Sequence, residues 1–399
     1  MKKLLFDLLA TQPISGNKFH GGSEYAKTVF YKLVESVSSN IFIDVFYDIN
    51  KKIENSILDL CKEKNITLHS CQNNFEISNL LLNNNYDTFY SAMPYKYIDL
   101  NIPFSTKFIY TIHGLRELEY PIDKLEFKYK KKCLRTVFKH IIYFFFFNYF
   151  AKYKIIKAKD NLKKLFSLTN NQKIISISNH SKYALNYFFP EIDVSRLSIY
   201  YSPAKTSNMI TAENEILEYL SLKQQKYILL IGGNRYIKGA WRACKVLSHL
   251  IASNRISTDI KILVLGVSNK SAYQKITKNN SQFIFKDYVD TNVLEILYKN
   301  AYFFMYPTLN EGFGYPPLEA MKYGIPCLCS ANSAITEICA DSVLYFNPFD
   351  ETEMAIRILQ IFNNIIYKEL KEKALIRHNY ISKKQEEDLN SLVNDLMSE

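Results

Sequence analysis

Short apolar runs alternate with amphipathic stretches along the first half of the chain. The runs are LLFDLL, IFIDVFYD, ITLHS, TFYSAM, FIYTIHG and IISIS, and polar or turn residues bound them. Between them, residues 23–37 and 55–64 carry apolar positions at helical spacing. Strands that alternate with helices are typical of a parallel sheet with crossover helices. Such sheets bind ligands at the carboxyl ends of their strands, where Gly21-Gly22, His113-Gly114 and Ser178-Asn179 fall.

The same pattern starts again after about residue 206. Its strand-like runs are YILLIGG, KILVLGV, QFIFKDYV, AYFFMYP, IPCLCS and SVLYFNP, again with helical patterns between them. Residues 202–205 (Ser-Pro-Ala-Lys) read as a linker, and a lysine- and glutamate-rich helical tail starts near Tyr367. The sequence therefore predicts an α/β protein with two doubly wound, Rossmann-like domains that face each other across a cleft.

Composition supports this size and class. The chain has 399 residues, of which 48% are hydrophobic and 22% charged, as in a globular protein of two domains. Its seven cysteines form no C-x-x-C pair, which predicts reduced thiols in a cytoplasmic protein. Asp7 interrupts the first apolar run, so we expect a buried strand there and not a signal peptide. No apolar run reaches the length of about 18 residues that a membrane-spanning helix needs.

The net charge of +11 is concentrated in residues 124–164, where twelve lysines and Arg135 stand against two acidic residues. This segment also contains the aromatic run IIYFFFFNYF, which is too short to span a bilayer. An apolar block flanked by cations is typical of a segment that lies on an anionic membrane. The alternative is a buried aromatic helix with solvated lysines around it. We do not expect nucleic-acid binding, because the aromatic residues form one block and do not alternate with the cations.

Two carboxylates flank a glycine turn in the segment NEGFGYPPLEAMKYGIP, which contains Glu311 and Glu319. Gly312 and Gly314 let the backbone turn closely around a ligand. A proline then fits the first turn of a helix, whose unpaired N–H groups suit a phosphate. Glu319, about one turn inside this helix, could accept hydrogen bonds from ribose hydroxyls.

A second candidate cluster follows the strand YILLIGG. Arg235 and Lys238 come directly after its Gly-Gly turn and present two cations at the end of a strand. Arginine makes forked contacts with phosphate oxygens, and lysine supplies a point charge. Both would stabilise the charge that develops on a diphosphate leaving group.

These residues and their flanks resemble the retaining glycosyltransferases of family 4 (glycosyl transferases group 1), which have the GT-B fold. The E-x7-E signature corresponds to Glu311 and Glu319. The similarity extends backward through KDYVD and LYKNAYFFMYPT and forward through SANSAITEICADSVLYFNPFD. In the first half, Gly21-Gly22, the His113-Gly114 turn and ISISNHSK extend the likeness over most of the chain.

The resemblance implies a nucleotide-sugar donor as substrate and assigns residue roles. The donor would be held by Gly21, Gly22, Arg235, Lys238, Phe313, Gly314, Tyr315, Leu318 and Glu319. His113 and Glu311 would contact the donor sugar at the reaction centre. Such enzymes need no metal or other cofactor, and the chain contains no Asp-x-Asp motif.

The resemblance also implies a domain plan. Residues 1–204 would bind the acceptor and would include the segment 124–164, while residues 205–380 would bind the donor. A helix over residues 381–399 would pack back on the N-terminal domain. The acceptor would be a glycan or a lipid-linked saccharide, and the enzyme would act in bacterial surface polysaccharide assembly, in the cytoplasm or at the inner face of the membrane.

Three other functions use similar chemistry. A glycosidase also needs two carboxylates, but it would not need Arg235, Lys238 and a phosphate-ready helix end. A nucleotide-sugar epimerase on the same scaffold, or a non-catalytic relative that binds sugar nucleotides, stays open.

Overall fold

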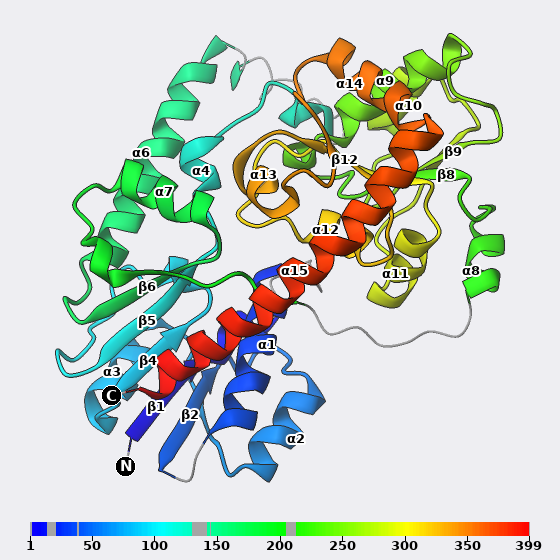
Figure 1. Cartoon of the computed structure of the whole chain (residues 1–399). Helices are drawn as coiled ribbons and strands as arrows, with labels where there is room; N and C mark the ends of the chain where they lie inside the picture. The colour runs from blue at the N-terminus through cyan, green and yellow to red at the C-terminus, as the bar shows by residue number, and fades with distance from the viewer. Residues whose placement is uncertain are drawn as a thin grey trace. The chain divides into compact units, whose positions relative to one another are not determined.

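The computed structural model describes residues 2–13, 21–37, 40–129, 142–143, 145–204 and 213–398. The chain forms two compact units. Unit 1 comprises Met1–Leu118, Ile155–Thr206 and Ser382–Glu399, and unit 2 comprises Glu119–Lys154 and Ser207–Ile381. Each unit contains one parallel sheet with helices connecting its strands (Figure 1).

The sheet of unit 1 has the strand order β3-β2-β1-β4-β5-β6-β7, and all of its pairs are parallel. The strands are β1 (Lys2–Asp7), β2 (Ile41–Tyr47), β3 (Thr67–Ser70), β4 (Thr88–Ser91), β5 (Lys107–Ile112), β6 (Gln172–Ser176) and β7 (Leu197–Ile199). The helices are α1 (Gly21–Ser36), α2 (Asn55–Glu63), α3 (Asn74–Asn84) and α7 (Asn179–Phe188), with the short 3-10 turns η1 (Leu8–Ala10), η2 (Pro94–Lys96) and η4 (Val194–Arg196). The six strands predicted for this half are confirmed, and β7 is additional.

The sheet of unit 2 has the strand order β10-β9-β8-β11-β12-β13 and is also parallel. The strands are β8 (Tyr227–Leu230), β9 (Lys261–Val264), β10 (Phe283–Phe285), β11 (Phe303–Tyr306), β12 (Cys327–Ser330) and β13 (Leu344–Phe346). The helices are α8 (Glu213–Tyr219), α9 (Ala240–Ala252), α10 (Ser271–Thr277), α11 (Thr291–Lys299), α12 (Tyr315–Met321), α13 (Ser333–Cys339) and α14 (Glu351–Ile361), with η3 (Glu126–Tyr129) and η5 (Tyr236–Lys238). All six strands predicted for this half are confirmed.

The central strands are buried on both faces because helices cover both sides of a doubly wound sheet. Every residue of β4, β8, β11 and β12 is buried, which explains their nearly continuous apolar sequences. Cys327 and Cys329 lie on β12 as predicted core residues, and burial raises the pKa of both thiols. The described cysteines are free thiols; Cys133 lies outside the described residues.

The strand order reverses between β1 and β4 in unit 1 and between β8 and β11 in unit 2. Open parallel sheets bind ligands just beyond the carboxyl ends of the strands at this switch point. In unit 2, the loops at this point contain Arg235, Lys238 and Glu311. In unit 1, Gly22 and His113 lie at the corresponding edge of the sheet.

In the part of the chain that the structure describes, three helices contain residues of both units: α4 (Arg116–Glu119), α6 (Phe147–Phe166) and α15 (Asn364–Met397). Helix α15, red in Figure 1, is continuous from Asn364, so no separate helix starts at residue 381. Its last turns belong to unit 1, where Asp388 accepts a hydrogen bond from the Tyr201 backbone N–H at 2.8 Å and Asp395 accepts one from the Tyr200 hydroxyl at 2.6 Å. Ser202–Ala204 of the expected linker are described, and Lys205 lies outside the described residues.

Residues 119–154 belong to unit 2, whereas the predicted plan placed them in the N-terminal domain. The reason is a buried anchor, in which Asp123 accepts two hydrogen bonds from Arg242 at 2.8 and 3.0 Å. Tyr129 packs in the core of unit 2, and its hydroxyl accepts a hydrogen bond from the Trp241 backbone N–H at 3.1 Å. This buried charged pair attaches the segment to unit 2, although its position in the sequence suggested the N-terminal domain.

Candidate functional site

Two loops of unit 2 meet at the switch point of its sheet. One follows β8 and ends in η5, and the other follows β11 and leads to α12. The backbone N–H of Leu309 donates to the Ile237 carbonyl at 2.7 Å, which ties the two loops together. At Gly239, φ is +68°, and an added Cβ would lie 1.9 Å from the Pro307 carbonyl oxygen. Only glycine allows the two loops to approach this closely.

The same turn aims Lys238 at the second loop. Gly232 has φ of +73°, and a Cβ there would lie 2.7 Å from Lys238 Cγ, so the lysine stem packs on bare backbone. Lys238 Nζ lies 2.6 Å from Glu311 Oε1 and 2.5 Å from the Tyr306 hydroxyl. The ion pair is largely shielded from water, with side-chain exposures of 11% for Lys238 and 15% for Glu311.

Glu311 is held by several donors at one oxygen. Besides Lys238, the hydroxyls of Tyr306 and Thr308 donate to Oε1 at 2.7 and 2.8 Å. The Glu311 backbone N–H donates to Ser333 Oγ at 2.8 Å. Burial alone would raise the pKa of this carboxyl, but the Lys238 charge and the three hydrogen bonds hold the pKa below its ordinary value. Glu311 is therefore an ionised, oriented carboxylate at neutral pH.

Glu319 lies inside α12, as the sequence predicted. The helix starts after Gly314, whose φ of +125° favours glycine, and prolines occupy its first turn. Burial and the neighbouring Glu319 carboxylate raise the pKa of the Tyr298 phenol well above its ordinary value. Glu319 thus lies beside a buried phenol, whereas Glu311 is paired with Lys238.

The remaining donor-site candidates of unit 2 surround these carboxylates. Arg235 is exposed, and its charge acts on Tyr306, lowering the pKa of a phenol that burial and Glu311 raise. The rings of Phe313 and Tyr315 lie 5.4 Å apart at the glycine turn. Phe313 and Leu318 are buried, so these two side chains pack in the protein interior.

Unit 1 contains the other three candidates. A Cβ on Gly22 would lie 2.4 Å from Met93 Sδ, whereas a Cβ on Gly21 would meet no atom within 4 Å. His113 follows β5, and its Nε2 lies 2.8 Å from the Ala92 carbonyl oxygen. Since a carbonyl only accepts, this nitrogen carries a proton. The ring also packs edge-on against Tyr25, with centroids 4.8 Å apart.

The structure therefore brings Lys238 and Glu311 into direct contact within unit 2, while Gly21, Gly22 and His113 lie in unit 1. Sequence reasoning missed Tyr306, Thr308 and Ser333. One signal was present for Tyr306, because it is the only polar side chain in the strand Phe303–Tyr306, at the end nearest the motif.

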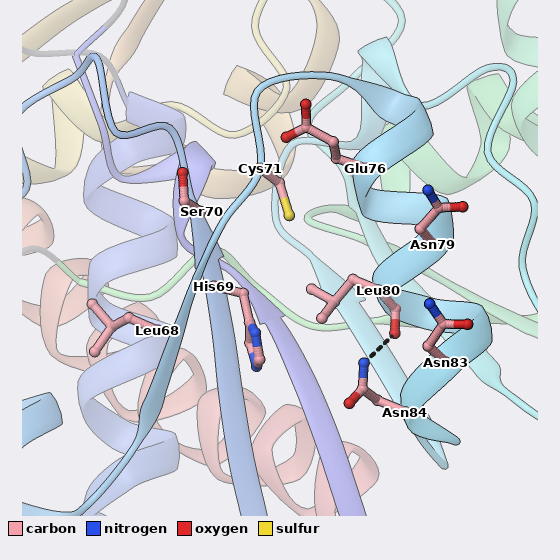
Figure 2. Close-up of a pocket in the computed structure, with 9 residues that line it drawn as sticks. All are labelled: Leu68, His69, Ser70, Cys71, Glu76, Asn79, Leu80, Asn83 and Asn84. Atoms are coloured by element: carbon pink, nitrogen blue, oxygen red, sulfur yellow. Dashed lines mark hydrogen bonds between the residues drawn. The ribbon is translucent and has the colours of Figure 1, made fainter.

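A polar groove of about 440 Å³ lies elsewhere in unit 1, between β3 and α3 (Figure 2). His69 and Ser70 line one side and Glu76, Asn79 and Asn83 the other. None of the predicted site residues lines this groove.

The described residues contain no cluster of three or more His, Cys, Asp or Glu side chains that could hold a metal ion. Within the same part of the chain, none of the helices has both the length and the apolar character needed to cross a bilayer.

Comparisons with known proteins agree with this geometry. Residues 225–364 match the family model described as "Glycosyl transferases group 1". The O-antigen chain mannosyltransferase RfbU of Salmonella typhimurium is 22% identical over 299 residues, which cover 72% of this chain and 69% of that protein.

Solved structures share the fold at low sequence identity. HepE of Anabaena, in complex with UDP and glucose, has a TM-score of 0.66 at 10% identity, with full coverage of both chains. WaaG, a glycosyltransferase involved in lipopolysaccharide biosynthesis, has a TM-score of 0.64 at 13% identity and covers 99% of this chain and 100% of its own.

The two doubly wound parallel sheets have the GT-B fold of these solved structures. Residues 225–364 match the group 1 glycosyltransferases, and the likeness to RfbU extends over 72% of the chain, so the predicted fold class and enzyme class are confirmed.

Proposed function

We propose that this glycosyltransferase moves a sugar from a nucleotide-sugar donor to a glycan or lipid-linked acceptor, with retention of anomeric configuration, in bacterial surface polysaccharide assembly. The observation that carries the proposal is the contact of Lys238, Tyr306 and Glu311 at the switch point of unit 2. The likeness to an O-antigen mannosyltransferase supports the polysaccharide context and makes a mannosyl donor the first to test.

We assign the cations to the donor diphosphate and the carboxylates to hydroxyl groups of the donor. Arg235 and Lys238 bind the donor diphosphate, Glu319 accepts hydrogen bonds from the ribose, and Glu311 contacts the sugar. Backbone groups of residues 313–315 and the buried Leu318 shape the donor site around them.

The unit 1 candidates complete the proposed active centre. Gly21 and Gly22, which are the first two residues of α1 and not a separate loop, are proposed contacts of the donor phosphates, and His113 is a proposed contact of the donor sugar.

The proposed reaction breaks the bond between the anomeric carbon and the diphosphate oxygen. An acceptor hydroxyl attacks the same face, its oxygen bonds to the anomeric carbon, and its proton passes to the leaving phosphate oxygen. Arg235 and Lys238 stabilise the negative charge that grows on the diphosphate. No metal or cofactor is invoked.

The donor assignment is tested with a panel of nucleotide sugars that includes GDP-mannose and UDP-glucose, scored by thermal stabilisation and by donor turnover. In Arg235→Ala, the concentration of the preferred nucleotide that gives half-maximal thermal stabilisation should rise about tenfold or more. Arg255→Ala, an exposed arginine elsewhere in unit 2, is the matched control. If no nucleotide diphosphate stabilises the wild-type protein, the donor site is wrongly assigned.

Product analysis separates the alternatives. An epimerase would change the sugar while it is still attached to the nucleotide and would need no acceptor. A non-catalytic relative would bind the nucleotide without turnover.

We further propose that helix α6 carries the enzyme to an anionic membrane surface, where a lipid-linked acceptor would lie. The helix and the two residues before it expose an apolar stripe with side chains 50–77% accessible: Phe145, Phe146, Tyr149, Tyr153 and Ile156. Lysines 152, 154, 157, 159, 163 and 164 lie on the same helix. Tyr143 of the aromatic run is buried against Phe127, as the alternative of a buried aromatic segment predicts for this residue. Residues 130–141 and 144 of the basic segment lie outside the described residues.

Vesicle sedimentation tests this contact. Vesicles of phosphatidylglycerol and phosphatidylcholine should sediment the protein, and pure phosphatidylcholine should do so much less. The double variant Tyr149→Ser, Tyr153→Ser should weaken binding about tenfold. The matched control replaces Tyr183 and Tyr187, which are 68% and 80% exposed on α7. Equal loss in both double variants, or no binding to anionic vesicles, would remove the membrane proposal.

A further inference from the structure

Tyr306 ends a strand in which all four residues, Phe303 to Tyr306, are fully buried. For packing alone, phenylalanine would serve as well at this position. A buried hydroxyl costs free energy unless it is hydrogen-bonded, so its partners should explain why it is there.

The direction of the hydrogen bonds around Tyr306 is fixed by the chemistry of its neighbours. A lysine ammonium only donates, so at the 2.5 Å contact with Lys238 the phenolic oxygen accepts. The phenolic proton is then directed to Glu311 Oε1, 2.7 Å away. Tyr306 therefore links the cation to the carboxylate.

All of these donors reach the same oxygen of Glu311. Lys238, Tyr306 and Thr308 donate to Oε1, while no group of the residues that the structure describes donates to Oε2. This arrangement sets the rotation of the carboxylate and leaves Oε2 as the acceptor for a ligand hydroxyl.

Two of these donors, Lys238 and Tyr306, differ in how they respond to a bound diphosphate. Lys238 is charged, so phosphate oxygens compete with Glu311 for it. Tyr306 is uncharged and is anchored in a buried strand, so it does not follow the phosphate. A Glu311 held by Lys238 alone would lose its orientation at the moment when the donor binds.

We propose that Tyr306 is a positioning residue for sugar transfer: it holds the Glu311 carboxylate in place while Lys238 turns to the donor diphosphate, so that Oε2 meets a hydroxyl of the donor sugar. The inference rests on the proposed function, because it takes Lys238 as a diphosphate ligand and Glu311 as a sugar ligand.

The first test measures the kinetics of Tyr306→Phe with the preferred donor. We expect kcat to fall about tenfold and the donor KM to change less than about threefold, because the contact orients a group and does not itself bind the nucleotide. Tyr227→Phe is the matched control. Tyr227 is equally buried in the same unit, and its hydroxyl donates to the Leu297 carbonyl oxygen at 2.6 Å, away from Glu311. A normal kcat in Tyr306→Phe would overturn the proposal.

A double-mutant cycle separates positioning from loss of structure. In a Glu311→Gln background, Tyr306→Phe should lower kcat less than about twofold further, because the group that it orients is already altered. If the two losses multiply, Tyr306 acts independently of Glu311 and the proposal fails.

A readout without turnover is the carboxyl resonance of Glu311 in protein labelled with ¹³C at glutamate Cδ. Its titration midpoint should move to higher pH in Tyr306→Phe, by about half a pH unit or more, and stay in place in Tyr227→Phe. An unchanged midpoint would show that the contact is absent in solution. If wild-type protein turns over no nucleotide sugar, the proposed function fails, while this titration still decides whether Tyr306 holds Glu311.

Discussion

Glu311 and Glu319 carry the same charge but lie in different surroundings. Glu311 is paired with Lys238 and receives hydrogen bonds from two hydroxyls, whereas Glu319 lies within α12 beside the buried Tyr298 phenol. A carboxylate already neutralised by a lysine is a poor general acid at neutral pH. This difference favours two ligand contacts at separate parts of one donor over an acid–base pair.

Substitution of the two glutamates should therefore give opposite patterns. Glu319→Ala should weaken binding of the nucleoside diphosphate about tenfold or more, because it removes the proposed charge-assisted hydrogen bonds to the ribose. Glu311→Ala should leave that affinity within about threefold and lower kcat at least tenfold. Isothermal titration with GDP or UDP and steady-state kinetics check the two halves, and a reversed pattern would refute the assigned roles.

The low pKa of Glu311 also predicts how stability depends on pH. The pKa in the folded protein lies below the ordinary value of 4.5, so the carboxylate stabilises the fold above pH 4.5 and loses this contribution as pH falls through the folded pKa. Glu311→Gln should thus cost on the order of 1–3 kcal/mol at pH 7 and progressively less at more acidic pH.

Urea unfolding at several pH values measures this dependence. Glu218→Gln, an exposed glutamate of unit 2, is the control and should change stability little at any pH. A stability difference for Glu311→Gln that grows on acidification would contradict the assignment.

The contact between the β8 and β11 loops depends on backbone geometry at one position. Gly239 ends η5 with a left-handed backbone, and its Cα faces the Pro307 carbonyl oxygen. This contact fixes the position of Lys238 relative to Glu311. The ion pair therefore depends on how the two loops pack together and not on either loop alone.

Gly239→Ala should consequently destabilise the protein by about 2 kcal/mol or more, since the added methyl group would collide with backbone atoms that cannot rotate away. It should also lower donor affinity by displacing Lys238. Thermal unfolding and nucleotide titration are the measurements. Gly21→Ala serves as the stability control, because its methyl group would enter open space; equal melting temperatures for the two variants would disprove the steric argument.

Residues 119–129 belong to unit 2, although the residues directly before them in the sequence belong to unit 1. Two hydrogen bonds join Asp123 and Arg242 within unit 2. The exposed fraction of the side chain is 1% for Asp123 and 13% for Arg242. The Arg242 guanidinium also lies 5.1 Å from the centroid of the Phe349 ring. Asn310, next to Glu311, donates to the Glu119 carboxylate at 3.0 Å, so this segment also contacts the loop that follows β11.

Asp123→Asn should destabilise the protein by about 3–5 kcal/mol, because it leaves the buried guanidinium without its counter-charge. The double variant Asp123→Asn, Arg242→Met should recover part of this loss, since it removes the stranded charge. Denaturant unfolding of the single and double variants decides the matter; if the double variant is less stable than Asp123→Asn, the pair is not what anchors the segment.

The sequence by itself determined most of the elements and the class of the enzyme. Apolar runs bounded by turns identify central strands because both faces of such a strand must be buried, and among the described residues twelve strands coincide with a predicted run. The strand β7 was not predicted, because three residues at the edge of a sheet are too few to show a clear hydrophobic pattern. The E-x7-E motif with its flanks identified α12 and its glycine turn, since those requirements are local.

Only the tertiary structure decided what joins residues far apart in the chain. The partners of Glu311 include Lys238, 73 positions away, and the partner of Asp123 lies 119 positions away. Helix α15 starts at Asn364 and continues through the predicted boundary at residue 381, although the part before this boundary belongs to unit 2 and the part after it to unit 1. Local patterns fix secondary structure, whereas domain membership and ion pairing depend on which distant surfaces bury one another.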